Sequence, residues 1–270
     1  MSFDYCADLV RRGDPDRFLS AMAAPPAGRA RLLALYAFVL EIARAAWSPR
    51  EPLIARMRLQ FWRDALGEMQ QGAPPRRHPV LQALVQSLAG SGIGAERLSP
   101  IVEARMWDVE AAPMTEAGLE SYLHDTAVVP MTLAAELLDA PAAEAAAALG
   151  QAMGAAGILR ALPRLAGAGR MPLPGVSRRD AALLAEGEVT AALAAAAQTL
   201  ARQGLAQAVR GRALARQADR RALPALRAGW RSGSVLRPLA EGVDFFQAIR
   251  PESEARRRFG HLVRVMLGRV

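Results

Sequence analysis

Acidic residues that could bind a metal as a pair are few in this chain. Asp64 and Glu68 stand at positions i and i+4, so on a helix both carboxylates would face the same side. Mg²⁺ is usually held by one or two carboxylates together with substrate phosphates. These two acids, with Asp108 and Glu110, are the candidate metal ligands if their side chains converge on one site. Arg63 is adjacent to the first pair, and charges on a helix face are mostly solvated, so we favour a surface position for that pair.

Histidine, cysteine and glycine do not form a recognisable site either. His78, His124 and His261 lie far apart without a His-x-x-x-His spacing, which argues against a zinc or di-iron centre. Cys6 is the only cysteine, so an intramolecular disulfide and a cysteine-based zinc site are excluded. The glycines of residues 90–94 follow a predicted helix and lack both a preceding strand and a P-loop lysine, so this segment is predicted to be a turn. We expect no metal and no cofactor.

The clearest pattern lies in residues 149–174, LGQAMGAAGILRALPRLAGAGRMPLP. This segment resembles the second aspartate-rich motif of the squalene/phytoene synthases, which is approximately G-x-A-x-Q-x-T-N-I-L-R-D-x-x-E-D-x-x-x-G-R-x-Y-L-P. The matching positions are Gly150, Ala152, Ile158, Leu159, Arg160, Gly169, Arg170, Leu173 and Pro174. Ala161 and Leu165 stand where the family has its two aspartates.

A second segment, residues 31–47, resembles the first motif of the same family, L-Y-A-F-C-R-x-x-D-D-x-x-D. The matching positions are Leu35, Tyr36, Ala37 and Phe38. Ala43, Arg44 and Trp47 occupy its aspartate positions. Tyr122 with Thr126 and Ala127 resembles a central Y-x-x-x-x-A-G motif, although Val128 replaces the glycine, and residues 60–66 resemble a W-R-x-x-L helix. The resemblance extends over about residues 5–174.

The resemblance implies an all-α fold, a single helical bundle of the isoprenoid synthase type over residues 1–270. Active members of the family join two allylic diphosphates head to head, and Mg²⁺ bound between facing aspartates neutralises the leaving diphosphate. Here the first motif offers Arg44 and the second offers neither acid. An arginine could grip a phosphate directly, but without metal the ionisation step loses its main electrophilic assistance. The chain therefore resembles a family member that lacks the metal ligands needed for catalysis.

The resemblance also implies which residues face the family's substrate cavity. The candidates are Tyr36, Phe38, Glu41, Arg44, Tyr122, Ala127, Arg160 and Arg170. We expect the three aromatic residues, Ala127 and Arg160 to face one common interior. Simpler roles remain open for each kind of residue: aromatic side chains at helical spacing often pack in a core, Glu41 could pair with a nearby arginine, and the arginines near the helix end could bind backbone carbonyls.

Three classes of function remain open. The favoured one is a non-catalytic binding protein, because residues 51–66 resemble the mitochondrial complex I assembly factors that carry a phytoene-synthase-like domain. That resemblance implies a protein partner such as a respiratory-complex intermediate, and an isoprenoid or other lipid could still occupy the cavity. The first alternative is an active prenyl-diphosphate transferase that holds Mg²⁺ with other acids. The second is a basic adaptor that binds a membrane surface or nucleic acid by charge alone.

The chain is basic, with a net charge of +8 and a pI near 11.0. It has no lysine and no asparagine, so part of this basicity reflects a GC-rich genome. Aromatic residues make up only 5% and are not interleaved with a basic stripe, which argues against nucleic acid as a partner. An acidic lipid or protein surface remains a candidate partner. The first residues do not resemble a secretory signal, and we expect a cytoplasmic protein, peripheral to the inner membrane.

Caps, prolines and apolar spacing predict helices almost throughout. The expected ranges are 14–23, 28–47, 51–71, 79–88, 99–112, 141–162 and 178–223, with Pro130 as a kink in another helix and Gly204 and Gly211 as interruptions. Residues 167–177 are expected to form a loop. No segment alternates with period two over enough residues to predict a sheet.

The last predicted helix, residues 254–270, is amphipathic. Its apolar stripe consists of Phe259, Leu262, Val263, Met266 and Leu267, flanked by several arginines. The favoured interpretation is that the stripe closes the core of the domain, as most amphipathic helices of globular proteins do. The alternative is that the helix lies on an anionic membrane.

Overall fold

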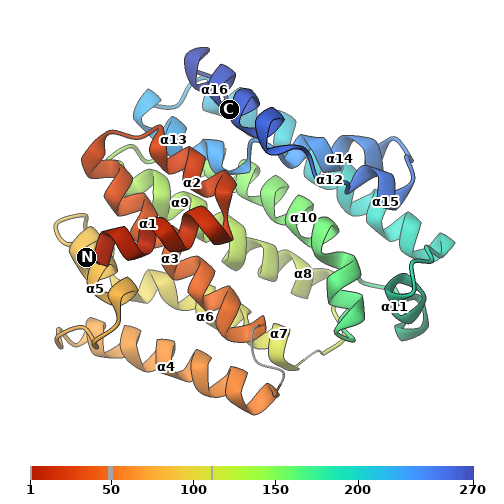
Figure 1. The fold of residues 1–270 in the computed structure, drawn as a ribbon, viewed down its shortest axis with the longest axis horizontal. Helices are drawn as coiled ribbons and strands as arrows, with labels where there is room; N and C mark the ends of the chain where they lie inside the picture. Colours follow the sequence, from red (N-terminus) through yellow and green to blue (C-terminus); the bar gives the residue numbers. More distant parts are fainter. Residues whose placement is uncertain (1, 48–50, 111) are drawn as a thin grey trace.

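The fold is all-α, as predicted, in a computed structural model that describes residues 2–47, 51–110 and 112–270 (Figure 1). Within those ranges there is no strand. In chain order the helices are α1 (Ser2–Gly13), α2 (Pro15–Met22), α3 (Pro26–Trp47), α4 (Pro52–Gln70), α5 (Pro79–Leu88), α6 (Ser99–Ala104), α7 (Met106–Glu110), α8 (Glu116–Leu123), α9 (Val129–Glu136), α10 (Ala143–Gly167), α11 (Arg178–Ala185), α12 (Ala191–Ala215), α13 (Leu223–Leu226), α14 (Ser232–Ala240), α15 (Phe245–Ala248) and α16 (Glu254–Met266). A π-helical turn, η2 (His124–Val128), precedes α9.

Prolines and capping side chains start several helices where the sequence predicts them. The Asp14 carboxylate accepts a hydrogen bond from the Arg17 backbone N–H at 3.0 Å, and Pro15 occupies the first turn of α2. α5 begins after His78, whose Nδ1 caps the Val80 N–H. The loop between α10 and α11 is also confirmed, since α10 ends at Gly167. Local signals alone therefore determine these boundaries.

Helix α10 is the central element of the fold. It packs against α12 along its length and also contacts α9, α11 and α14 (Figure 1). Its first turns contribute Ala145 and Leu149 to one cluster of buried apolar residues, and its later turns contribute Ala156 and Leu159 to a second cluster. In the described part of the chain it is also the one helix long and apolar enough to cross a membrane, yet most of that apolar window is buried inside the protein.

The predicted helix over residues 99–112 is divided into α6 and α7. Arg105 lies between them, and its N–H bonds to the Val102 carbonyl at 3.2 Å, which tightens the turn. This break directs the Arg105 and Asp108 side chains toward each other and toward Tyr122. Near Pro130, the Val129 N–H reaches back to the His124 carbonyl, so a widened π turn replaces a simple proline kink.

Gly204 and Gly211 were expected to interrupt a helix, and that expectation is wrong. α12 continues through both positions because each glycine allows another helix to approach closely. A Cβ at Gly204 would lie 3.0 Å from the Ala155 Cβ, and one at Gly211 would lie 2.6 Å from the Leu149 Cγ. The two glycines therefore allow the close packing of α12 on α10.

Two glycines of α10 give a matched test of this packing. A Cβ at Gly150 would lie 2.8 Å from the Val128 Cα, whereas nothing lies within 4 Å of a Cβ at Gly157. We expect Gly150→Ala to destabilise the protein by about 1–3 kcal/mol, because backbone must move. Gly157→Ala should stabilise it by about 0.5–1 kcal/mol through helix propensity. Urea unfolding of both variants measures the difference, and equal effects would contradict this packing.

The C-terminal helix is confirmed, but it ends at Met266 and does not close the core with its apolar stripe. Phe259, Leu262, Met266 and Leu267 are exposed by 69%, 54%, 76% and 56%. The side of α16 that packs on the protein instead presents His261 and Gly260 to Trp230. The helix lies at one edge of the molecule, and α4 lies at the opposite edge (Figure 1).

His261 makes the stability of the protein depend on pH. Burial, with Arg227 and Arg264 nearby, lowers the pKa of this histidine from 6.5 to about 4. The folded state therefore resists a proton that the unfolded chain accepts, so the free energy of unfolding should fall as pH drops from 6.5 toward 4. Urea unfolding across this window should show a steeper loss for the wild type than for His261→Leu. Parallel pH profiles of the two proteins would contradict the assignment.

Candidate functional site

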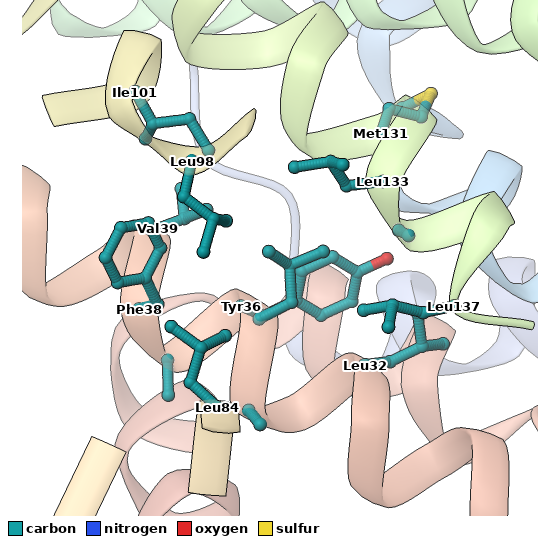
Figure 2. Packing of buried hydrophobic residues seen from close by; sticks show 14 of the residues in the cluster. Leu32, Tyr36, Phe38, Val39, Leu84, Leu98, Ile101, Met131, Leu133 and Leu137 are labelled. Carbon is teal, nitrogen blue, oxygen red and sulfur yellow. The ribbon is translucent and has the colours of Figure 1, made fainter. Parts of the chain in front are cut away.

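Tyr36 and Phe38 lie on different sides of α3 (Figure 2). Phe38 packs edge-on against Trp62 of α4, with ring centroids 5.6 Å apart, inside the apolar core. Tyr36 is also buried, but the Arg17 guanidinium of α2 stacks over its ring at 5.5 Å. Both residues therefore belong to one buried apolar cluster, but their rings point to different sides of α3, because residues two apart on a helix point in nearly opposite directions.

The C-terminal ends of α3 and α10 face each other through an aromatic and two basic side chains. The Arg170 guanidinium lies 4.4 Å from the Trp47 ring centroid, and that of Arg164 lies 6.0 Å from it. A cation over an indole face is attracted by the ring quadrupole, and Trp is the strongest aromatic partner. This contact joins the two segments that resemble the aspartate-rich motifs. We call Trp47, Arg164 and Arg170 the cation–aromatic clasp.

The other residues at the expected aspartate positions are not acidic. Ala43 and Ala161 are half-buried, and Leu165 is buried. Arg44 is exposed and pairs with Glu41, with 3.6 Å between Nη1 and Oε1. Glu41 thus pairs with a neighbouring arginine, which is the simpler of its two expected roles. The junction is basic and aromatic where a magnesium site would need carboxylates.

Tyr122 belongs to a buried polar network with Asp108 and Arg105. Its hydroxyl lies 3.0 and 3.1 Å from the two Asp108 carboxylate oxygens, and Arg105 Nη1 donates to the same hydroxyl at 2.6 Å. Burial raises the pKa of Tyr122, so the phenol stays protonated and can donate to the carboxylate. Arg105 also pairs with Asp108 at 3.0 Å. The network fixes α7 against α8.

Arg160 lies within a third polar group, formed with Asp16 of α2 and with Arg231, the residue that precedes α14. Its Nε donates to the Ala156 carbonyl at 3.3 Å, and burial, the largest cause, lowers its pKa. Asp16 acts on it electrostatically and is itself paired with Arg231 at 3.1 Å. Burial raises the pKa of Asp16 despite Arg231. Arg160 therefore satisfies one carbonyl of its own helix while its charge is partly balanced by Asp16.

Ala127 of η2 is a packing residue against α10. A Cβ at Gly154 would lie 3.0 Å from the Ala127 Cβ, and a Cβ at Gly150 would lie 3.0 Å from the Ala127 carbonyl oxygen. The small residues on both sides allow η2 to approach α10 closely. Gly157, one turn further along α10, is exposed, so α10 is open to solvent at that turn.

The acids that could have replaced the lost aspartates do not converge. Glu68 is held by Arg76 of the following loop at 2.7 Å, and Asp64 lies 3.8 Å from the same guanidinium. Asp108 is occupied by Arg105 and Tyr122, and Glu110 is exposed. Across residues 2–47, 51–110 and 112–270, no three His, Cys, Asp or Glu side chains are grouped closely enough to hold a metal ion. The donor set at the α3–α10 junction does not fit Mg²⁺, which needs hard oxygen ligands.

Residues 10–244 match the model of one protein family, described as squalene/phytoene synthase. The chain belongs to this family. Its likeness to solved members extends over the whole helical frame: a dehydrosqualene synthase crystallised with a ligand has a TM-score of 0.81, with 19% sequence identity over 98% of this chain and 95% of that one. A squalene synthase from Alicyclobacillus acidocaldarius has a TM-score of 0.75, with 17% identity over 93% and 95% of the two chains.

The chain has sequence relatives of two kinds. Complex I assembly factor 6 of Bos taurus and of Homo sapiens is 30% identical over 187 residues, which cover 65% of this chain and 56% of the relative. Presqualene diphosphate synthase of Rhodopseudomonas palustris is 35% identical over 132 residues, 47% of this chain and 45% of the relative. The chain thus spans just over half the length of the assembly factors, and about half of the synthase.

Several residues of the site were not predicted from the sequence. Arg164 lies in the second motif, one turn after Arg160, and its spacing could have suggested a second basic side chain at the same helix end. Asp16 lies in the first turn of α2. Its pairing with Arg231, more than two hundred residues away in the chain, is a tertiary contact that no local pattern indicates.

Proposed function

We propose that this family member acts by binding and does not catalyse metal-dependent prenyl transfer. The observation that supports this proposal most is the cation–aromatic clasp at the α3–α10 junction, where Arg164 and Arg170 stack on Trp47. Two facing carboxylate pairs would have to stand at this junction to hold Mg²⁺ and diphosphate. The clasp instead joins the two helices directly.

We further propose a role like that of an assembly factor, with a protein partner and a position at the inner face of the membrane. Support comes from the 30% identity to complex I assembly factor 6, which extends over 65% of this chain, whereas the match to presqualene diphosphate synthase covers 47%. The proposed partner is an intermediate of a respiratory complex. A lipid or isoprenoid chain bound beside α10, where Gly157 is open, would be compatible with this role.

Deleting the gene in its host tests the proposed role. We expect membranes of the deletion strain to lose NADH-driven electron transfer and to keep succinate-driven electron transfer, which does not require complex I. The wild-type gene supplied on a plasmid should restore the loss. Unchanged NADH oxidation in the deletion strain would contradict the assembly role.

An active prenyl-diphosphate transferase is the second candidate, favoured by the 35% identity to presqualene diphosphate synthase. This candidate requires metal ligands that the described residues do not group together. It predicts instead that the deletion strain loses an isoprenoid product while NADH oxidation stays normal. The same strain therefore distinguishes the two proposals by lipid extraction.

A further inference from the structure

A cavity of about 600 Å³ lies between α12, α14 and α16, away from the α3–α10 junction. Six arginines line it and Glu252 is the only acid in its lining; the arginines are Arg212, Arg231, Arg237, Arg256, Arg264 and Arg269. Arg231 is neutralised, since it pairs with Asp16 at 3.1 Å and with Glu252 at 3.4 Å. For the other five, no ion pair is found in the described ranges of the chain.

The positive charges in this cavity act on one another. Burial, followed by the charges of Arg264 and Arg237, lowers the pKa of Arg212. Arg264 is held in place, because its guanidinium stacks on Trp230 at 4.6 Å and its Nη1 donates to the Gly260 carbonyl at 3.0 Å. Gly260 allows this arrangement, since a Cβ there would lie 3.1 Å from the Trp230 ring. An anion in the cavity would relieve the repulsion between these arginines.

The cavity lies beside the exposed apolar face of α16. Arg256, Gly260 and Arg264 follow one side of the helix at intervals of four residues and face the cavity. Phe259 and Met266, seven residues apart, share the neighbouring side that faces away from the protein and are exposed by 69% and 76%. Leu267 belongs to both the cavity lining and the exposed apolar face, because it lines the cavity and is itself exposed.

We propose that the arginine-lined cavity holds the phosphate group of an anionic phospholipid while the outer face of α16 lies in the acyl layer. A lipid headgroup fits this site better than a free phosphate, because exposed apolar side chains lie directly beside the cavity. An amphipathic helix with arginines around an aromatic and aliphatic face has the composition of an interfacial membrane helix. This inference does not depend on whether the protein assembles a respiratory complex.

Sedimentation with vesicles tests the proposal. The full-length protein should bind vesicles that contain phosphatidylglycerol and should not bind vesicles of phosphatidylcholine alone. Arg237→Gln combined with Arg256→Gln should weaken binding about 25-fold, since each basic residue near an anionic surface contributes about fivefold. Both side chains are exposed, so the variant is expected to fold. Arg178→Gln combined with Arg179→Gln on α11 is the matched control and should bind like the wild type.

A second pair of variants tests the apolar face. Phe259→Ser with Met266→Ser should lower binding by at least about tenfold, because the buried area of two large side chains is lost. Leu53→Ser with Met57→Ser, on the exposed apolar side of α4, is the comparison and should have little effect. α4 lies at the opposite edge of the molecule from α16, so this comparison tests whether membrane binding depends on the apolar face beside the cavity (Figure 1).

Three results would overturn the proposal. The first is equal binding to both kinds of vesicle. The second is a loss of binding in the α4 variant and not in the α16 variant. The third is calorimetric saturation of the cavity by inorganic phosphate, abolished in Arg237→Gln/Arg256→Gln, in a protein that does not bind vesicles, which would assign the cavity to a free phosphate compound.

Discussion

Incubated with farnesyl or geranylgeranyl diphosphate and Mg²⁺, the protein is expected to release no pyrophosphate above the uncatalysed background. Ionisation of an allylic diphosphate places several negative charges on the leaving group, and family enzymes neutralise them with Mg²⁺. Here Ala43, Arg44 and Trp47 of the first motif and Ala161 and Leu165 of the second occupy the positions where those ligands would stand. The arginines of the clasp have no oxygen ligands, so they cannot hold Mg²⁺ in place of the aspartates.

A family synthase with both aspartate motifs intact, assayed in parallel, is the positive control for this experiment. Pyrophosphate release is followed with and without a chelator. Chelator-sensitive pyrophosphate release at a usual enzymatic rate, on the order of 1 per second or faster, would contradict the proposal that the protein acts only by binding.

The largest effect on stability is expected from Asp108→Ala, which should lower the free energy of unfolding by about 3–5 kcal/mol. Asp108 is only 1% exposed and accepts hydrogen bonds from Arg105 and Tyr122. Removing its carboxylate leaves the Arg105 charge buried without compensation and the Tyr122 hydroxyl without its acceptor. Urea unfolding monitored by circular dichroism measures this effect.

The control for Asp108→Ala is Glu103→Ala in the preceding helix. Glu103 pairs with Arg63, but its side chain is 52% exposed, so its loss should cost no more than about 1 kcal/mol. Tyr122→Phe should fall between the two, because it removes one hydroxyl and keeps the Arg105–Asp108 pair. Equal effects of Asp108→Ala and Glu103→Ala would contradict a buried network.

The helical frame could be predicted from the sequence because its signals are local. Asp14 and Pro15 mark the start of α2, and His78 and Pro79 mark that of α5, by hydrogen bonds and φ restrictions that involve neighbours in the chain. The order of residues in the two motifs predicted the family, which the match over residues 10–244 confirms.

Positions that depend on tertiary contact were harder to predict. Gly211 lies inside α12, although the sequence indicates an interruption there, because its role depends on Leu149 of another helix. The stripe of α16 has the spacing of a core face, yet Phe259 is exposed because the helix packs through His261 and Gly260 instead. Periodicity indicates that a face is apolar, but it does not indicate what covers that face.

The candidate site shows the same difference between features that are visible in the sequence and features that depend on tertiary contacts. The absence of the aspartates is visible in the sequence, but the stacking of Arg170 on Trp47 is not, since it joins residues of two separate motifs. The pairing of Tyr122 with Asp108 also requires the break between α6 and α7. In both cases the residue types were known and the tertiary arrangement decided their partners.

Electron paramagnetic resonance of Mn²⁺ tests most directly the claim that this family member has lost its metal–diphosphate site. Mn²⁺ replaces Mg²⁺ at carboxylate and phosphate ligands, and its spectrum separates free from protein-bound ion. With inorganic diphosphate present, we predict the same spectrum with and without the protein. A stoichiometric, protein-dependent Mn²⁺ signal would show that the protein still binds the metal, at the junction of α3 and α10 or elsewhere, and would contradict the loss of this site.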